Sequence, residues 1–367
     1  MRDDSADYLN LFLRDAALLD VRAPVEFNAG AFPRSTNIPL LDDRQREQIG
    51  TRYKDAGQDA AITLGLQLAT PALRAQRIGD WSAFCRENPE GYLYCFRGGL
   101  RSHTTQAWLR EAGLDYPLVR GGYKALRGFL LLALEHNLTH TPLLVLSGST
   151  GVGKTTLLRQ VPRKLDLEAR AQHRGSAFGS LVDAQPPQIS WENAVAVDLL
   201  KLVQGEAARL PVLLEDESRL IGHIHVPPFM QERMYTAPRI LLEAPLEQRI
   251  ANISADYIEQ PWQQHLHLHG AAAQQQFGTR VLHNLQRICK RLGAERHARV
   301  EQLFRSGIAA LPHGDRAAFH AGIRILLQEY YDPLYHHKLQ QHQQGLVFRG
   351  EHVAVLEWLQ HHMAQPA

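Results

Sequence analysis

Short apolar runs alternate with helical patterns over the first 135 residues. Residues 17–21 and 92–94 predict buried strands, and Leu118-Val119 predicts a third. Residues 103–112 predict a helix that ends at Gly113, because glycine commonly terminates helices. Strands that alternate with helices are typical of an α/β domain with a parallel sheet.

A second series of this kind follows the polar connector at 138–142. Strands are predicted at 143–146, 211–214 and 239–242, and a helix from Lys154. Beyond residue 256 the strand signals fade, and the pattern becomes mainly helical. We therefore predict an α/β protein with domains at 1–137 and 138–255, the second with a parallel sheet, and a mainly helical region at 256–367.

Composition narrows the class of protein. Of 367 residues, 44% are hydrophobic and 21% are charged, which excludes wholesale disorder. No apolar run approaches the ~18 residues that cross a bilayer, and the acidic, polar start does not resemble a signal peptide. Three cysteines are too few for a disulfide framework or a four-thiolate zinc site. We expect a cytoplasmic protein without a membrane partner.

A cysteine loop lies between a predicted strand and a predicted helix. After Cys95 it carries two arginines, two glycines and a serine: Arg97, Gly98, Gly99, Arg101 and Ser102. Glycines allow several N–H groups to turn inward as an anion site, and the arginines add positive charge. Such a site would favour the thiolate of Cys95, the nucleophilic form.

A phosphate loop follows the strand at 143–146. Its residues fit G-x-x-x-x-G-K-[ST] without a mismatch: Gly148, Ser149, Thr150, Gly151, Val152, Gly153, Lys154 and Thr155, followed by Thr156. We expect the backbone N–H groups to surround a diphosphate, Lys154 to neutralise its charge, and Thr155 to be able to hold Mg²⁺.

Acidic residues follow the strand at 211–214. Glu215, Asp216 and Glu217, with Arg219 close behind, resemble the metal-side motif of nucleotide hydrolases. The pattern does not indicate which carboxylate faces the phosphate loop, and a solvated turn is the alternative.

Basic residues concentrate at 280–305, where seven arginines and lysines stand against two glutamates, although the net charge of the chain is only +2. Arg287 and Arg291 share one helix face, and Lys290 lies beside them. Such a stripe suits nucleic-acid phosphates and carries no base specificity. His173 and Arg174 are further candidates for contact with phosphate or base.

Several motifs carry a resemblance to known families. Residues 20–27, 30–33 and 37–39 resemble the opening signature of rhodanese-like domains, and 119–122 resemble the closing one. Cys95 then stands where that family carries sulfur. The interval from Cys95 to Arg101 is one residue longer than in most sulfur-transferring rhodaneses, and phosphatases of this fold share it. Longer stretches, including 121–127, 173–179 and 215–219, make residues 15–260 resemble the tRNA 2-selenouridine synthase family.

This resemblance implies a transferase acting on the wobble uridine, position 34, of tRNAs for Lys, Glu and Gln. It implies that 2-thiouridine is first S-geranylated with geranyl diphosphate at the phosphate loop. Selenophosphate would then supply selenium through a Cys95-bound intermediate, with Arg97, Arg101 and Ser102 holding its phosphate. The partners implied are the tRNA anticodon arm and the two donors. No tightly bound cofactor is expected, although Mg²⁺ could bind at Thr155.

Two other functions remain open from the sequence. One is a phosphate-loop nucleotide hydrolase with a rhodanese-like binding module, in which Cys95 would be dispensable. The other is a phosphatase, suggested by the interval between Cys95 and Arg101. Neither accounts for both loops and the basic stripe.

Overall fold

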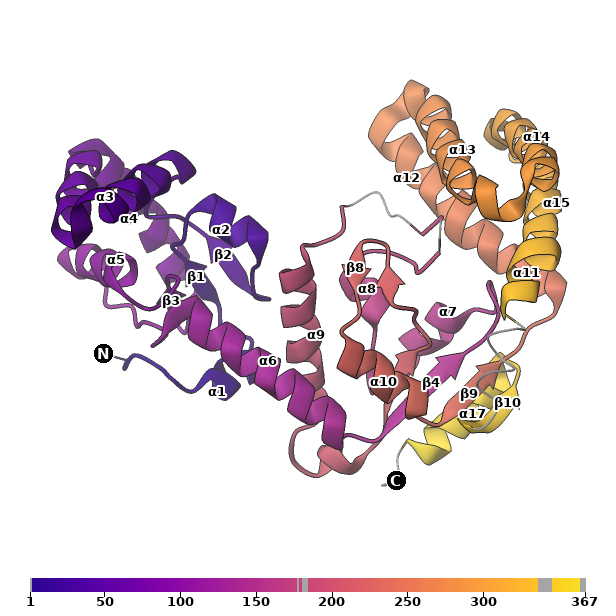
Figure 1. Cartoon of the computed structure of the whole chain (residues 1–367), viewed down its shortest axis with the longest axis horizontal. Helices are drawn as coiled ribbons and strands as arrows, with labels where there is room; N and C mark the ends of the chain where they lie inside the picture. Colours follow the sequence, from indigo (N-terminus) through magenta and orange to yellow (C-terminus); the bar gives the residue numbers. More distant parts are fainter. Residues whose placement is uncertain (1, 177, 180–183, 336–344, 364–367) are drawn as a thin grey trace. The chain divides into compact units, whose positions relative to one another are not determined.

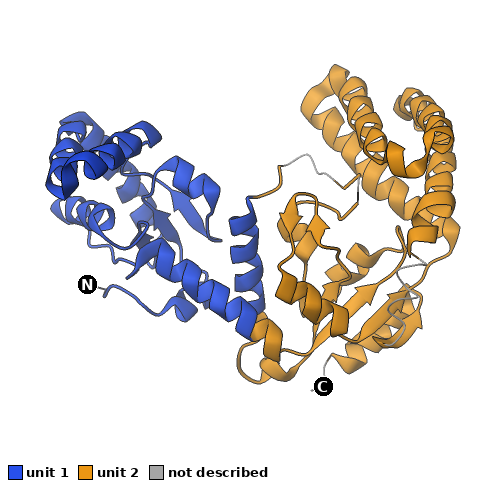
Figure 2. Cartoon of the chain, in the orientation of Figure 1, with its two compact units in different colours: residues 1–136, 187–201 blue, residues 137–186, 202–367 orange. Residues whose placement is uncertain are grey.

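The computed structural model describes residues 2–176, 178–179, 184–335 and 345–363 (Figure 1). The chain divides into two compact units, 1–136 with 187–201 and 137–186 with 202–367 (Figure 2). These limits differ from the predicted domains. Residues 187–201 lie inside the predicted second domain but belong to the first unit, and 256–367 do not separate from the phosphate-loop unit.

The first unit contains a parallel three-stranded sheet in the order β2-β1-β3. Its strands are β1 (Leu18–Asp20), β2 (Ser35–Asn37) and β3 (Tyr92–Tyr94). The predicted strands at 17–21 and 92–94 are thus confirmed, while Leu118 and Val119 form isolated parallel bridges. Its helices are α1 (Tyr8–Leu13), α2 (Pro24–Ala29), α3 (Asp43–Leu68), α4 (Pro71–Glu87), α5 (Leu100–Glu111) and most of α6 (Gly122–His140) and α9 (Gln188–Leu202).

A buried ion pair organises the centre of this unit. Arg22 donates to Asp20 at 2.7 Å and to the carbonyl of Gly30 at 2.8 Å, and Tyr94 donates to the same carboxylate at 2.7 Å. The Arg22 guanidinium also lies 3.8 Å from the ring centroid of Tyr123. Each of these buried polar groups therefore has a hydrogen-bond partner within the protein and does not need water. The same contacts hold the end of β1 against Gly30 and against β3.

The second unit is built on a parallel five-stranded sheet in the order β10-β9-β4-β6-β5. The strands are β4 (Leu143–Ser147), β5 (Lys164–Leu165), β6 (Val212–Glu215), β9 (Arg239–Leu242) and β10 (Leu346–Gly350). Every residue of β4, β6 and β9 is buried, as expected where helices cover both faces of a parallel sheet. Its shorter elements are α7 (Lys154–Arg159), α8 (Leu167–Ala171), a 3₁₀ turn (Gly205–Arg209), the hairpin of β7 (Leu220–Ile221) and β8 (Ile224–His225), and α10 (Pro228–Thr236).

The C-terminal part is mainly helical, as predicted. It contains α11 (Leu246–Ile253), a π-helical turn (Ser254–Glu259), α12 (Gln260–His269), α13 (Ala273–Leu292), α14 (Ala294–Ala310), α15 (Ala317–Leu326), a second π turn (Leu327–Tyr331) and α17 (His352–His362). On α13, Phe277, Val281, Leu285 and Ile288 recur at helical spacing and are buried. Gly293, with φ +88°, separates α13 from α14, because residues other than glycine rarely adopt this angle.

Strand β10 departs from the predicted helical character of 256–367. It pairs with β9, and α17 packs against the same sheet through Val355 and Leu359. The strand lies at the sheet edge and is partly exposed, so it lacks the continuous apolar run that marks a buried strand. Among the described residues, no helix has the length and apolar character needed to cross a membrane.

Candidate functional site

The cysteine loop begins where β3 ends and leads into α5. The Cys95 sulfur is buried, lies 3.2 Å from the hydroxyl oxygen of Ser102 and 3.9 Å from the carbonyl of Gly99. Ser102 is also buried and donates to that carbonyl at 2.9 Å. Cys95, Gly99 and Ser102 lie together because they belong to the short stretch between the end of β3 and the first turn of α5.

Glycine is required where the loop touches the start of α6. Gly98 and Gly122 both have positive φ, +64° and +58°. A Cβ on Gly122 would lie 2.3 Å from the Cys95 carbonyl and 2.5 Å from the Gly98 nitrogen. The two backbones therefore meet without side chains between them, and this contact fixes the shape of the loop around Cys95.

Arg101 points to a carboxylate from another segment. Its guanidinium binds Glu26 through two contacts of 2.5 and 3.1 Å. Burial works to raise the pKa of Glu26, but the hydrogen bonds and charge of Arg101 outweigh it and lower that pKa overall. Sequence reasoning missed Glu26, although it lies in the quoted stretch 20–27.

A hollow of about 980 Å³ lies beside the loop. Arg97 and Arg101 line it, together with Glu26, Phe96 and Tyr123, whereas Cys95 does not. Arg97 is exposed. The two arginines therefore offer charge to an anion in this hollow, and the Cys95 sulfur lies behind the surface.

The phosphate loop connects β4 to α7, the context that its motif predicts. Gly151 and Gly153 have φ of +84° and +91°. A Cβ on Gly148 would lie 2.7 Å from the carbonyl of Leu242, so the loop passes tightly over β9. Lys154 donates from Nζ to the Gly148 carbonyl at 2.8 Å, which folds its ammonium back across the loop.

Helix α11 supports this loop from the side. Arg249 donates to the carbonyl of Thr150 at 2.9 Å, and Asn252 donates to that of Gly151 at 2.8 Å. Arg249 in turn binds Asp332 through two further hydrogen bonds. These contacts fix the backbone of the loop at Thr150 and Gly151.

Three glutamates gather beside Lys154. Glu168, Glu215 and Glu217 each offer a carboxylate oxygen, and these oxygens lie within 4.8 Å of one another. Burial, followed by the Glu217 charge, raises the pKa of Glu168 to about 8. Burial and neighbouring carboxylates likewise raise the pKa of Glu215 to about 8 and that of Glu217 to about 7. Carboxylates held this close repel one another unless a proton or a cation lies between them.

The cluster fits a hard divalent cation. Mg²⁺ prefers oxygen ligands, and the Thr155 hydroxyl donates to Glu215 at 3.4 Å, beside the same oxygens. The sequence analysis assigned no role to Glu168, although residues 166–168 are among the stretches that carry the family resemblance. An acidic residue just after a short strand was the available signal, but only the fold brings it to Glu215.

The other members of the acidic element point elsewhere. Asp216 lies at the pocket wall but pairs with Arg239 at 3.2 Å and accepts from Ser147 at 3.1 Å. Arg219 is exposed and is not among the residues that line the pocket. Of the four residues predicted here, Glu215 and Glu217 join the carboxylate cluster, and Asp216 and Arg219 do not.

The candidates for nucleic-acid contact separate into two groups. Arg287, Lys290 and Arg291 are exposed on α13. Arg174 lines the phosphate-loop pocket and binds Asp256 at 2.9 Å. His173 is buried, and burial, with Arg287 next, lowers its pKa.

The chain is similar to known proteins over its whole length. Residues 141–366 match the family described as tRNA 2-selenouridine synthase AAA domain. Relatives named tRNA 2-selenouridine synthase include one from Marinobacter nauticus, 46% identical over 97% of each chain, and one from Cupriavidus necator, 44% identical over 100% of each. A third, from Alcanivorax borkumensis, is 45% identical over 98% of this chain and 99% of its own.

Proposed function

Because this chain belongs to the tRNA 2-selenouridine synthase family, we propose that it converts 2-thiouridine to 2-selenouridine at wobble position 34 of tRNAs for Lys, Glu and Gln. The proposal has two steps, S-geranylation with geranyl diphosphate and selenation with selenophosphate. One observation carries it: a single chain holds both a glycine-rich loop with Lys154 and a cysteine loop flanked by Arg97 and Arg101. A tRNA substrate also implies the cytoplasm.

In the first step the thiocarbonyl sulfur forms a bond to C1 of the geranyl group. The C1–O bond breaks, its electron pair leaves on diphosphate, and N3 of the base loses its proton to solvent. Lys154 and the loop N–H groups would stabilise the charge that develops on the diphosphate. Glu168, Glu215 and Glu217 would hold Mg²⁺, which supplies further charge neutralisation when bound.

In the second step the sulfur of the S-geranyl base is replaced. Selenium bonds to C2, the C2–S bond breaks, and geranylthiol leaves; water takes the phosphoryl group as phosphate. Alkylation makes this substitution feasible, because a thiol is a better leaving group than sulfide. Arg97, Arg101 and Ser102 would hold the phosphate of the donor.

Cys95 would form the covalent intermediate of this step. Selenium in selenophosphate is at the selenide level, so a bond to the Cys95 sulfur forms only with loss of two electrons. A Cys95–selenium bond would therefore need a two-electron oxidant, which neither donor supplies, so we place the covalent bond between Cys95 and the base. The Cys95 thiolate attacks C2 and geranylthiol leaves; the selenium of selenophosphate then bonds to C2, the Cys95–C2 bond breaks with return of the thiolate, and water takes the phosphoryl group. This sequence balances without an oxidant. The mass of the trapped Cys95 peptide, with added selenium or an added nucleotide, separates these routes.

The test is nucleoside mass spectrometry of 2-thiouridine tRNA incubated with the protein, with each donor omitted in turn. We expect S-geranyl-2-thiouridine with geranyl diphosphate alone and 2-selenouridine only with both donors. The nucleotide-hydrolase alternative has its own support in the contact between Thr155 and Glu215. It predicts ATP or GTP turnover and no modified nucleoside under any combination.

A further inference from the structure

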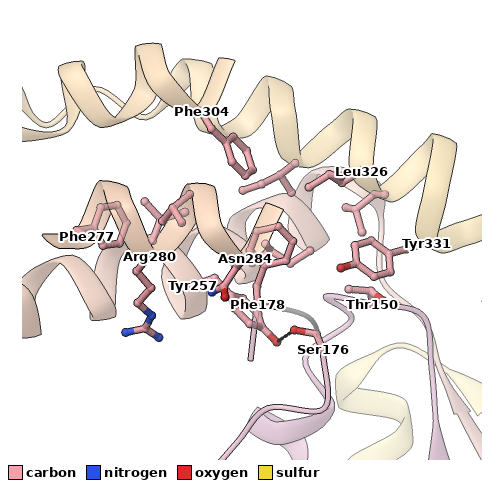
Figure 3. A pocket seen from close by; sticks show the side chains of 15 residues that line it. Thr150, Ser176, Phe178, Tyr257, Phe277, Arg280, Asn284, Phe304, Leu326 and Tyr331 are labelled. Atoms are coloured by element: carbon pink, nitrogen blue, oxygen red, sulfur yellow. Dashed lines mark hydrogen bonds between the residues drawn. The ribbon is translucent and has the colours of Figure 1, made fainter. Parts of the chain in front are cut away.

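An apolar slot opens beside the phosphate loop (Figure 3). Most of its walls are rings and branched side chains from α13, α14, α15 and the segment after α8, chiefly Phe178, Phe277, Phe304, Val281, Ile323 and Leu326. Arg280 and Asn284 of α13 also line it. Phe178 stands edge-on to Phe304, with ring centroids 6.3 Å apart. None of these side chains enters the chemistry assigned above.

The slot and the phosphate pocket share a mouth. Thr150 of the phosphate loop, Ser176, Ile253 and Tyr257 line both cavities. Ser176 and Tyr257 are joined by a hydrogen bond of 3.3 Å at this mouth. On one side lie Lys154 and the loop N–H groups, and on the other lie rings and aliphatic chains. The combined cavity therefore suits a molecule with an anionic head and a hydrocarbon tail.

We propose that this slot holds the hydrocarbon chain of geranyl diphosphate while the phosphate loop holds its diphosphate. The inference rests on the proposed function, which supplies the substrate, and adds where its chain lies. A nucleoside attached to the same diphosphate would place ribose hydroxyls and base nitrogens against walls that are mainly apolar, and burying unpaired polar atoms is unfavourable. A hydrocarbon chain carries no such cost and gains from leaving water.

The slot is narrow, with a cavity volume of about 50 Å³. A ten-carbon chain therefore displaces a wall as it enters. Among the residues that line the slot, Phe178 has the side chain best placed to move, because it is half-buried and belongs to a loop. Phe277 and Phe304 are almost fully buried on helices. The Phe178 ring thus sets how long a chain the slot accepts.

Binding measurements distinguish the contribution of the diphosphate group to affinity from that of the hydrocarbon chain. Calorimetry would compare inorganic diphosphate, dimethylallyl diphosphate with five carbons and geranyl diphosphate with ten, all with Mg²⁺. Each buried methylene contributes roughly fourfold in affinity, so five further carbons give at most about a thousandfold. We expect geranyl diphosphate to bind at least tenfold more tightly than dimethylallyl diphosphate.

Two neighbouring residues of α13 give a matched pair of variants. Val281→Phe fills the slot and should remove most of the geranyl preference while inorganic diphosphate binds as before. Leu282 packs on the same hydrophobic cluster but does not line the slot, so Leu282→Phe should keep the preference. Phe178→Ala, at a half-buried position, should instead shift preference toward farnesyl diphosphate, with fifteen carbons. Thermal unfolding checks that each variant is folded.

The outcomes distinguish the two levels of the proposal. Wild type could prefer geranyl diphosphate while folded Val281→Phe and folded Phe178→Ala both keep that preference. The hydrocarbon chain would then lie elsewhere, and the slot assignment would be overturned while the proposed function stands. If wild type binds inorganic diphosphate but shows no dependence on chain length, the slot assignment is likewise overturned. If it binds no diphosphate and forms no geranylated tRNA, the proposed function falls, and this inference falls with it.

Discussion

The Cys95 sulfur lies 3.2 Å from the hydroxyl of Ser102, which already donates its hydrogen to the Gly99 carbonyl at 2.9 Å. The hydroxyl oxygen thus presents lone pairs to the sulfur, an arrangement that suits a thiol as donor. When the thiolate forms, the same hydroxyl can turn and donate to it. Ser102 therefore has a hydrogen-bonding role in both protonation states of Cys95.

Replacing Cys95 should separate the two steps. We expect Cys95→Ser to form S-geranyl-2-thiouridine at the wild-type rate and to give no 2-selenouridine, because serine is a much weaker nucleophile than a thiolate. Nucleoside mass spectrometry measures both products. Cys289→Ser, at a half-buried cysteine of α13, is the control and should retain both steps. Selenation by Cys95→Ser would remove Cys95 from the mechanism.

Removing Lys154 should affect the first step. Lys154→Ala deletes the ammonium that folds across the phosphate loop, so we expect the geranylated product to fall by at least tenfold, since charge-assisted contacts contribute roughly 1.5–3 kcal/mol. Lys164→Ala is the control, because the Lys164 ammonium donates to the Arg159 carbonyl at 3.1 Å and Lys164 does not line the phosphate-loop pocket. Accumulation of the geranylated nucleoside in Lys154→Ala would instead assign this loop to selenation.

The glutamate cluster should make stability depend on pH. Glu168, Glu215 and Glu217 have folded pKa values of about 8, 8 and 7, against an ordinary value of 4.5. Between pH 4.5 and 8 the folded chain binds more protons than the unfolded chain, so stability should fall as pH rises through this window. Below pH 4.5 the protonated glutamates make their full contribution to the free energy of unfolding, and above pH 8 this contribution is lost.

Magnesium should oppose that loss. Cation binding favours the ionised carboxylates, so the increase in Tm on adding Mg²⁺ should grow from pH 6 to pH 8. Thermal unfolding with Mg²⁺ or with a chelator measures this difference. Glu247→Gln, at an exposed carboxylate paired with Arg324, should leave it unchanged, and Glu168→Gln should reduce it. An equal Mg²⁺ effect at both pH values would argue against cation binding by the cluster.

Arg101 should control use of the selenium donor. Arg101→Ala removes a guanidinium from the hollow beside Cys95, and we expect KM for selenophosphate to rise roughly 10- to 100-fold, the equivalent of about 1.5–3 kcal/mol. Geranylation should continue. Arg110→Ala, at an exposed arginine of the same helix paired with Asp115, is the control. An unchanged KM would show that Arg101 serves Glu26 alone.

The exposed basic face of α13 should bind tRNA phosphates. Arg287→Ala combined with Arg291→Ala should weaken tRNA affinity about equally for all sequences and make log Kd less dependent on log salt, by roughly 0.7–0.9 per lost phosphate contact. Titrations at several salt concentrations measure this slope. Arg349→Ala, at an exposed arginine paired with Glu243, is the control. A slope equal to that of wild type would place the tRNA on another surface.

The sequence by itself determined the local parts of this protein. Strands such as Tyr92–Tyr94 and Arg239–Leu242 were predicted at their observed bounds, because buried parallel strands are continuous apolar runs. The phosphate loop and the cysteine loop were also predictable, since each loop consists of residues that are neighbours in the sequence. The motifs were sufficient to identify the family.

The tertiary structure alone decided which distant residues meet. It brought Glu168 to Glu215 and Glu217, turned Asp216 to Arg239, gave Arg101 the partner Glu26, and added β10 to the phosphate-loop sheet. It also formed the apolar slot from segments that are far apart in the sequence. Such contacts depend on how helices and strands pack, and a periodic pattern within one segment shows only which face is buried, not which segment covers it.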